Sequence, residues 1–314
     1  MKKNKTSVTG TVKKRDPRKD WQLYLFLLLP MIYIILFKYI PMAELVIAFK
    51  DYHVRKGIWG SDWVGFANFI KFFESYKFWR VIKNTVILSL YAIVVAFPLP
   101  IIFALMVNCL RNKKFKKVAQ VIVNLPHFIS TVVMVGIVFS VLNSRTGLYG
   151  MLFHELTGSY PEDLFASPGA FRHIYVWSGV WQNFGWNSII YQAALTSVDP
   201  SFHEAAQIDG ASRLKRVFYI DLPALLPTII TMLILRMGSV MSIGFEKVFL
   251  MQNSLNLSVS EVISTYEYQI GLSSNGSGDF SLATAVGMFN SVIQFALVII
   301  VNKISKQVSE TSLW

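Results

Sequence analysis

The sequence has little charge and almost no cysteine. Charged residues make up 15% of its 314 residues, against roughly 25% in an average globular protein. Hydrophobic residues make up 54%, and the mean hydropathy is +0.47. This composition excludes a disordered chain, a coiled coil and a disulfide scaffold. The single cysteine, Cys109, permits no intrachain disulfide and does not indicate a redox compartment.

The motifs of common enzymes are also missing. No G-x-x-x-x-G-K-[ST] segment is present, so we expect no ATP site built on a phosphate loop in this chain. No H-E-x-x-H and no Cys/His cluster is present, so we expect no metal site. An intramembrane serine hydrolase needs a buried serine beside a histidine, whereas Gly271-Leu272-Ser273 falls in a loop. We therefore expect no catalytic residue, no resident cofactor and no enzymatic activity.

The net charge of +12 is concentrated in clusters. Eight Lys/Arg residues lie in positions 1–20, and five lie in Arg111–Lys117. Both clusters flank long apolar runs, which is how basic residues orient membrane spans and is not the pattern of a nucleic-acid site. We expect residues 1–20 to form a cytoplasmic basic tail.

Six apolar segments approach or exceed the roughly 20 residues that cross a bilayer, which predicts an all-α membrane protein with six transmembrane helices. The first is too long for the apolar part of a signal peptide. The fourth is the weakest, because four amide side chains interrupt it, and the open alternative is a buried helix. The predicted spans are approximately 22–41, 84–108, 118–142, 173–198, 222–243 and 283–302.

The distribution of basic residues predicts the orientation of these spans. With a cytoplasmic N-terminus, the inner segments carry 18 Lys/Arg residues and the outer loops carry eight. This asymmetry favours both termini inside. The loop 42–80 is the exception, with six basic residues, but its many aromatic residues suggest a segment packed on the outer interface.

The segment between the fourth and fifth spans is the most informative. Ser201 and Glu204 form an S-x-x-E capping box, which predicts a helix that starts near Phe202. Gly210 can end this helix in a left-handed conformation. Ser212 can cap a second short helix that runs toward the next span. We expect two short helices joined by a bend, with small side chains of mixed charge that suit a protein contact.

Three short motifs in this segment carry a family resemblance. Glu204-Ala205-Ala206, Asp209-Gly210-Ala211 and Ile220-Asp221-Leu222-Pro223 resemble the EAA loop of ABC importer membrane subunits. The resemblance extends to carbohydrate-importer permeases of the LplB type over nearly the whole chain. The additional similar segments are 244–247, 262–266, 283–290 and 309–314.

The resemblance implies a type I ABC importer permease fold in one domain, residues 21–314, with a coupling loop at 199–223. In this family the EAA helix docks in a groove of the ATPase, whereas the alternative is a loop that only connects two helices. The implied partners are a second, different permease, two ATPase subunits that bind ATP and Mg, and an extracellular solute-binding lipoprotein at a bacterial plasma membrane. The coupling candidates are Glu204, Ala205, Ala206, Asp209, Gly210, Ala211, Arg213 and Pro223.

Polar and aromatic residues within the spans suggest a path for a sugar. They recur at helical spacing in the fourth and sixth spans, and polar groups in spans usually face the bundle interior. Amides bind hydroxyl groups and aromatic rings cover the C–H faces of a sugar, but the same side chains can instead join helices. The candidates for this path are Trp181, Asn183, Asn187, Tyr191, Asn290 and Gln294.

Three further residues on the sixth span and one arginine are interpreted structurally. Ala283, Gly287 and Ser291 form a small-residue ridge that predicts a helix–helix contact. Arg236 is expected either to be paired, with Glu246 as one possible partner, or to lie near the wide end of the cavity.

Three functions compete. The first is the pore-forming permease of an ATP-driven importer of oligosaccharides or polysaccharide fragments. The second is a permease of the same superfamily for another solute, such as a peptide or an amino acid. The third is a stand-alone channel or secondary transporter, which inverted repeats or broken helices would support. We find neither in the sequence, and the EAA pattern favours the first two.

Overall fold

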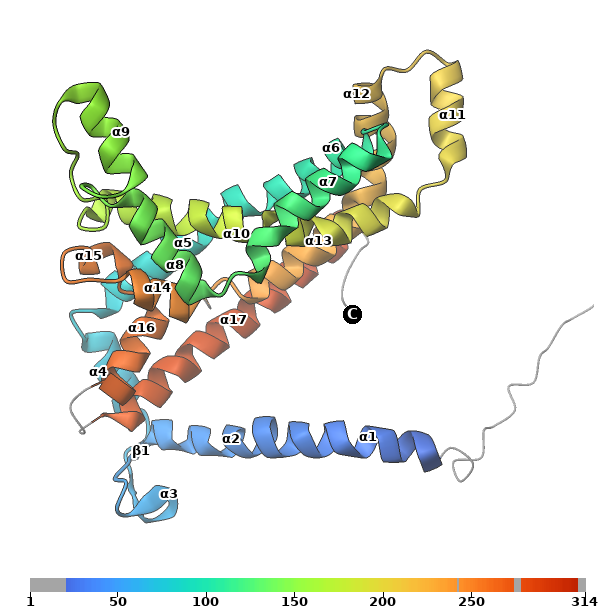
Figure 1. Cartoon of the computed structure of the whole chain (residues 1–314). Helices are drawn as coiled ribbons and strands as arrows, with labels where there is room; N and C mark the ends of the chain where they lie inside the picture. Colours follow the sequence, from blue (N-terminus) through green and yellow to red (C-terminus); the bar gives the residue numbers. More distant parts are fainter. Residues whose placement is uncertain (1–20, 242, 274–277, 310–314) are drawn as a thin grey trace, which may run out of the picture.

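The computed structural model describes residues 21–309 except 242 and 274–277. The predicted basic tail, 1–20, and the terminal segment 310–314 lie outside the described residues. The described chain is almost entirely helical, and its only sheet there is a two-stranded hairpin. The all-α prediction is confirmed. Figure 1 shows that the coupling segment, α11–α12, lies at one end of the bundle, opposite α4, α9 and α15.

The first span stands apart from the rest of the molecule. It is a continuous helix, Trp21–Phe49, and none of its apolar window is buried. Figure 1 shows it running beside the bundle and joining it only near α4 and β1. Its parts are α1 (Trp21–Ile34), the π-helical turn η2 (Ile35–Tyr39), α2 (Ile40–Ala43) and the 3-10 helix η3 (Glu44–Phe49).

The aromatic segment that follows packs partly on itself and partly on distant parts of the chain, where Phe72 contacts the rings of Tyr266 and Phe289. The rings of Phe49 and Trp63 stack with centroids 5.7 Å apart, and Phe72 is fully buried. Lys50 pairs with Trp63 across the hairpin. Trp59 is 90% exposed. The elements here are β1 (Lys50–Asp51), α3 (Gly57–Gly60), β2 (Asp62–Trp63) and α4 (Ala67–Glu74).

The middle of the chain forms a long span, a sharply broken helix pair and a 29-residue helix that contains several polar residues. The broken pair, Lys113–Phe128 and Thr131–Leu142, bends by 100°. Ser130 caps its second half, because its hydroxyl accepts the N–H of Val133. The elements are α5 (Phe78–Ala96), α6 (Pro98–Asn108), α7 (Lys113–Asn124), η4 (Leu125–Phe128), α8 (Thr131–Leu142), α9 (Leu148–Thr157) and α10 (Pro168–Thr196).

The last part of the chain contains the coupling segment, the fifth and sixth spans and the short helices between them. The sixth span is the 30-residue helix α17. The elements are α11 (Pro200–Ile208), α12 (Arg213–Arg216), η5 (Val217–Asp221), α13 (Leu222–Gly238), α14 (Phe245–Met251), α15 (Leu257–Ser260), α16 (Ile263–Tyr268), η6 (Gln269–Ser273) and α17 (Phe280–Ser309).

Length and hydropathy alone do not reproduce the count of six spans. Within the described residues, four helices are long and apolar enough to cross a membrane, and there are five if the bent pair is counted as one span. The remaining predicted span, the fourth at 173–198, corresponds to α10, a 29-residue helix. Its length is sufficient, but its polar side chains lower its hydropathy, as expected for a helix that faces the interior of a bundle.

Close helix contacts fix the arrangement around α10. A β-carbon at Gly185 would lie 2.3 Å from the carbonyl oxygen of Val123, so only glycine allows α10 to approach α7 this closely. The small-residue face of α17 also has a neighbour in its own chain. A β-carbon at Gly287 would lie 2.6 Å from a carboxylate oxygen of Glu267 on α16. The interior helices are therefore held close together by glycine positions.

Candidate functional site

The coupling helix α11 begins differently from the capping box that the sequence predicts. Asp199 is its N-cap: the carboxylate accepts the backbone N–H of Ser201 at 2.9 Å. This hydrogen bond lowers the pKa of Asp199. The helix starts at Pro200, so the prediction of a start near Phe202 is wrong. Proline at the first helical position suits this earlier start, because its fixed φ matches the helix and its missing N–H is not needed there.

The end of α11 agrees with the sequence. Gly210 has a φ of +75°, in the left-handed region. The N–H of Ala211 donates to the Ala206 carbonyl at 2.8 Å, and the N–H of Gly210 donates to the Gln207 carbonyl at 3.1 Å. These two bonds form a Schellman motif, which satisfies the last carbonyl groups of the helix. The helix therefore has a defined end followed by a fixed bend.

The second short helix also forms as predicted. Ser212 caps α12, since its hydroxyl accepts the N–H of Lys215 at 3.3 Å. The chain then continues without a break through η5 into α13, where Pro223 lies in the first turn. The bend at Gly210 is therefore followed closely by a continuous helical stretch that leads into the fifth span.

Most of the predicted coupling residues lie on the surface of this chain. Among the described residues, Ala206 and Ala211 are half-buried and the other six are exposed. Two large apolar side chains on α11 are also exposed, Phe202 at 61% and Ile208 at 87%. Such an exposed mixture of apolar and charged groups is typical of a surface that contacts another protein.

A polar cavity of about 520 Å³ lies behind α11, between this helix and the inner ends of α6 and α10. Within it, Nε2 of His203 lies 3.2 Å from Oδ1 of Asp221, which is 2% exposed. Asn108, at the end of α6, donates to the same oxygen at 3.2 Å. No motif or spacing in the sequence distinguished His203. Its side chain joins the coupling helix to η5, and Asp221 in turn joins η5 to α6.

A second cavity lies halfway along the spans. It has a volume of about 310 Å³ and is formed by α5, α10, the end of α13 and α14. Two of the predicted path residues, Asn183 and Asn187, line it. Asn183 is hydrogen-bonded to the Gly179 carbonyl at 3.1 Å and to Nδ1 of His127 at 3.0 Å. Asn187 is exposed.

The other predicted path residues lie elsewhere. Trp181 is 43% exposed, and Tyr191 is buried in an apolar cluster with Leu195 and Leu225. Asn290 is 8% exposed, and its Oδ1 has no hydrogen-bond partner within the described part of the chain. Gln294 is half-buried and has a polar or ring contact. None of these four lines the 310 Å³ cavity, so the structure groups Asn183 with Asn187 only.

Two cations line this cavity, and one of them, Arg236, was expected either to be paired or to lie near the wide end of the cavity. Arg236 lines the cavity and forms no ion pair with Glu246. Lys247, in the predicted outer loop between the fifth and sixth spans, is buried against α10 and lines the same cavity. No periodic signal could have identified Lys247, because it lies on a short helix between two spans.

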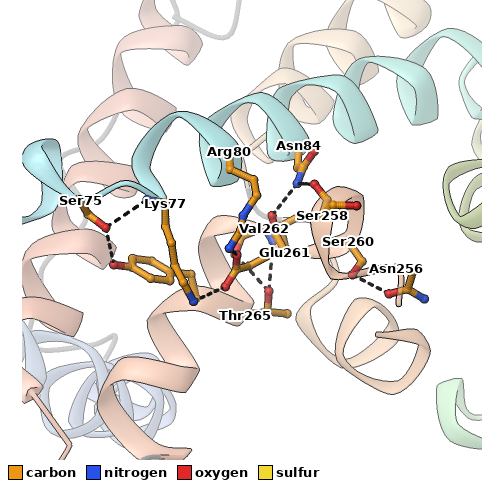
Figure 2. Close-up of polar contacts among 11 residues, drawn as sticks. Ser75, Lys77, Arg80, Asn84, Asn256, Ser258, Ser260, Glu261, Val262 and Thr265 are labelled. Carbon is orange, nitrogen blue, oxygen red and sulfur yellow. Dashed lines mark hydrogen bonds and ion pairs between the residues drawn. The ribbon is translucent and has the colours of Figure 1, made fainter. Parts of the chain in front are cut away.

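A buried ion pair at the opposite end of the bundle was also missed. Figure 2 shows Glu261, which is fully buried, between the side chains of Lys77 and Arg80. Nζ of Lys77 lies 2.8 Å from Oε1, and the Arg80 guanidinium contacts Oε2. Asn84 donates to the carbonyls of Ser258 and Glu261 at 2.9 Å and 3.1 Å. These contacts hold the α15–α16 segment against the start of α5.

Two proteins of known sequence are similar to this chain over nearly its whole length. LplB of Bacillus subtilis (strain 168) is 40% identical over 297 residues, which cover 95% of this chain and 92% of LplB. The Polygalacturonan/rhamnogalacturonan transport system permease protein YteP of the same organism is 40% identical over 316 residues, which cover 98% of this chain and 97% of YteP.

Two solved structures and a family model also match this chain. A bacterial ABC transporter involved in the import of the acidic polysaccharide alginate contains a chain that superposes with a TM-score of 0.85 at 37% identity. The match covers 93% of this chain and 97% of that one. A related structure, in complex with an alginate pentasaccharide-bound periplasmic protein, gives a TM-score of 0.86 at 36% identity, covering 94% and 98%. The family model matches residues 96–309. This chain belongs to the family of binding-protein-dependent transport system inner membrane components.

Proposed function

We propose that this chain is one permease of an ABC importer that moves oligosaccharides or polysaccharide fragments, delivered by an extracellular solute-binding protein. The observation that carries the proposal is the geometry of α11: an exposed, capped helix with a fixed bend at Gly210, joined directly to a span. The names of YteP and of the alginate transporter support a carbohydrate as the solute.

The energy for transport comes from separate ATPase subunits, which bind ATP and Mg. The exposed side chains of α11, with Glu204, Asp209 and Arg213, dock on the ATPase. Closure of the ATPase pushes α11, and the push reaches α13 through η5 and through the His203–Asp221 pair. The affinity for the solute must differ between the two states, because a conformational change drives transport only through such a difference.

The chain supplies half of a pore, and a different permease supplies the other half. Within its first span, the apolar window of 18 residues is not buried by the chain itself, so another chain or lipid must cover that window. Both termini face the cytoplasm. In support, α1 begins and α17 ends on the same side of the bundle as α11 (Figure 1).

Reconstitution in proteoliposomes tests this function. The complete complex, with loaded binding protein outside and ATP inside, should take up a saturable amount of oligosaccharide. Replacing ATP by a non-hydrolysable analogue should stop uptake after at most one cycle. This chain reconstituted alone should show no saturable uptake. Solute-specific uptake by the chain alone would refute the half-pore proposal and favour a secondary transporter.

A further inference from the structure

Lys247 is a buried cation whose amine lies at the wall of the mid-span cavity. The residue is 8% exposed and lines the cavity of about 310 Å³. Its Nζ donates to the Tyr175 carbonyl at 2.6 Å and lies 4.6 Å from the centre of the Tyr175 ring. A β-carbon at Gly179 would lie 3.0 Å from this amine, so the glycine leaves room for it. The protein itself therefore holds the amine in place.

Arg236 is the second cation at this cavity. It also lines a smaller adjoining space of about 120 Å³, which shares Ala92 and Tyr175 with the larger one. Neither Arg236 nor Lys247 has a carboxylate within ion-pair distance in the part of the chain described. No acidic residue lines either space. Two basic side chains thus share a site to which this chain contributes no carboxylate.

The depth of the site makes this imbalance costly. The cavity lies along α10 between Tyr175 and Asn187. With a rise of 1.5 Å per residue, this stretch begins and ends about 10 Å or more from the ends of the helix. Cations at such depth are expensive and usually serve a solute or ion path. A purely structural pair would be expected to have a neutralising partner nearby.

We propose that Lys247 and Arg236 bind a carboxylate group of the transported sugar, so that the solute is an acidic oligosaccharide built from uronate-type units. This inference rests on the proposed function and specifies its substrate class. An ammonium has three donors, and only one is used by the Tyr175 carbonyl. A guanidinium can hold a carboxylate through two parallel hydrogen bonds.

The remaining lining suits the rest of the sugar. Asn183 and Asn187 lie on the same cavity and offer amide groups to hydroxyls. The volume of about 310 Å³ lies at the lower end of small-molecule sites, roughly 300–1,000 Å³. The cavity therefore suits one or two sugar units from this chain's side, while a partner permease would enclose the rest.

The experiment compares acidic trisaccharides with their own methyl esters, which have the same length but no charge. The complete importer is reconstituted with wild-type, Lys247→Gln, Arg236→Gln or Lys247→Arg chains. Lys303→Gln serves as the matched control, because Lys303 is an exposed lysine on α17 that does not line the cavity. Probes are the trimers of galacturonate, mannuronate and guluronate, their methyl esters, and maltotriose as a neutral sugar. The readout is KM for ATP-dependent uptake, with assembly of each complex checked by gel filtration.

The wild-type importer should take up at least one acidic trimer and prefer it to its ester. Lys247→Gln and Arg236→Gln should each raise KM for the acid about tenfold or more, as expected for loss of a hydrogen bond to a charged group. KM for the ester should change little, and Lys247→Arg and Lys303→Gln should behave as wild type. If the complex with Lys247→Gln fails to assemble, the Arg236→Gln variant alone tests the proposal, because Arg236 is exposed.

The results that would contradict the carboxylate site differ from the result that would contradict the proposed function. Equal uptake of acid and ester, uptake of maltotriose alone, or an acid preference unchanged in both Gln variants would overturn the carboxylate site and leave the importer function standing. Absence of ATP-dependent uptake for every sugar tested would count against the proposed function itself.

Discussion

The imidazole of His203, on the coupling helix, lies 3.2 Å from the buried carboxylate of Asp221, at the foot of the fifth span. Asn108 donates to the same carboxylate from the end of α6. One side chain of α11 is therefore connected to two different spans. Such a connection can transmit a movement of the helix, provided that the contact survives the movement.

Breaking this pair should weaken coupling. His203→Ala removes the donor that faces Asp221, and loss of a hydrogen bond to a charged group costs about 1.5–3 kcal/mol. We expect transport per ATP hydrolysed to fall about tenfold, while basal ATPase activity persists. The measurement is the ratio of solute uptake to phosphate release in proteoliposomes. His203→Gln, which keeps a donor, should retain more coupling than His203→Ala, and equal ratios in both variants would contradict this role.

The left-handed turn at Gly210 should also be essential for coupling. A β-carbon there meets no atom within 4 Å, so a substitution acts through backbone strain alone, about 1 kcal/mol or more. Gly210→Val should abolish the stimulation of ATPase activity by loaded binding protein. Gly210→Asn should be milder, because asparagine tolerates the left-handed region. Gly136→Ala is the control, since its β-carbon also meets open space but its φ is ordinary.

Reversing the charge of Glu204 tests the docking surface directly. Glu204 is exposed on α11, so Glu204→Lys should leave the fold intact while removing the contact with the ATPase. We expect loss of stimulated ATPase activity with a normal yield of purified subunit. Glu155→Lys is a suitable control, because Glu155 is exposed on α9, at the opposite end of the bundle. Wild-type stimulation in Glu204→Lys would refute the docking role.

The orientation of the chain can be tested by labelling single cysteines in a Cys109→Ser background. Cysteines at Ser159 and Leu255 should react with a membrane-impermeant maleimide added to intact cells. Cysteines at Lys113 and Arg213 should react only after permeabilisation, because the asymmetry of basic residues places them inside. Reaction of either inner position in intact cells would show that the proposed topology is inverted.

The Glu261 ion pair should contribute to stability. Glu261→Gln leaves Lys77 and Arg80 without their partner carboxylate. Removing one partner of a buried pair costs several kcal/mol, and we expect about 2 kcal/mol here because both cations are partly exposed. The check is a lower melting temperature in detergent. Asp62→Asn, which breaks the exposed pair with Lys56, should leave the melting temperature unchanged.

The local features of the coupling segment were readable from the sequence because they depend on neighbouring residues. The bend at Gly210 and the cap at Ser212 follow from short motifs, and both are present in the structure. The start of α11 was misplaced because two capping signals overlap there. Asp199 followed by Pro200 competes with the Ser201 capping box, and the structure uses Asp199.

The tertiary partners were not readable. Lys77 and Glu261 are 184 positions apart in the chain, and no sequence pattern pairs them. Helical spacing did identify Asn183 and Asn187 as neighbours, and both line one cavity. The same spacing included Tyr191, which instead packs in an apolar cluster. Periodicity identifies a face of a helix, but packing determines which part of that face is open.

The isolated first span has a consequence for a subunit that has not yet been assembled. Its apolar window, within Trp21–Phe49, gains no packing from the helices that follow it. Without a partner subunit, this window must be covered by lipid. Its exposed Pro30, inside the helix, leaves a weak point in the backbone ladder. An unassembled copy would therefore hold this weakened helix in lipid without support from a neighbouring helix.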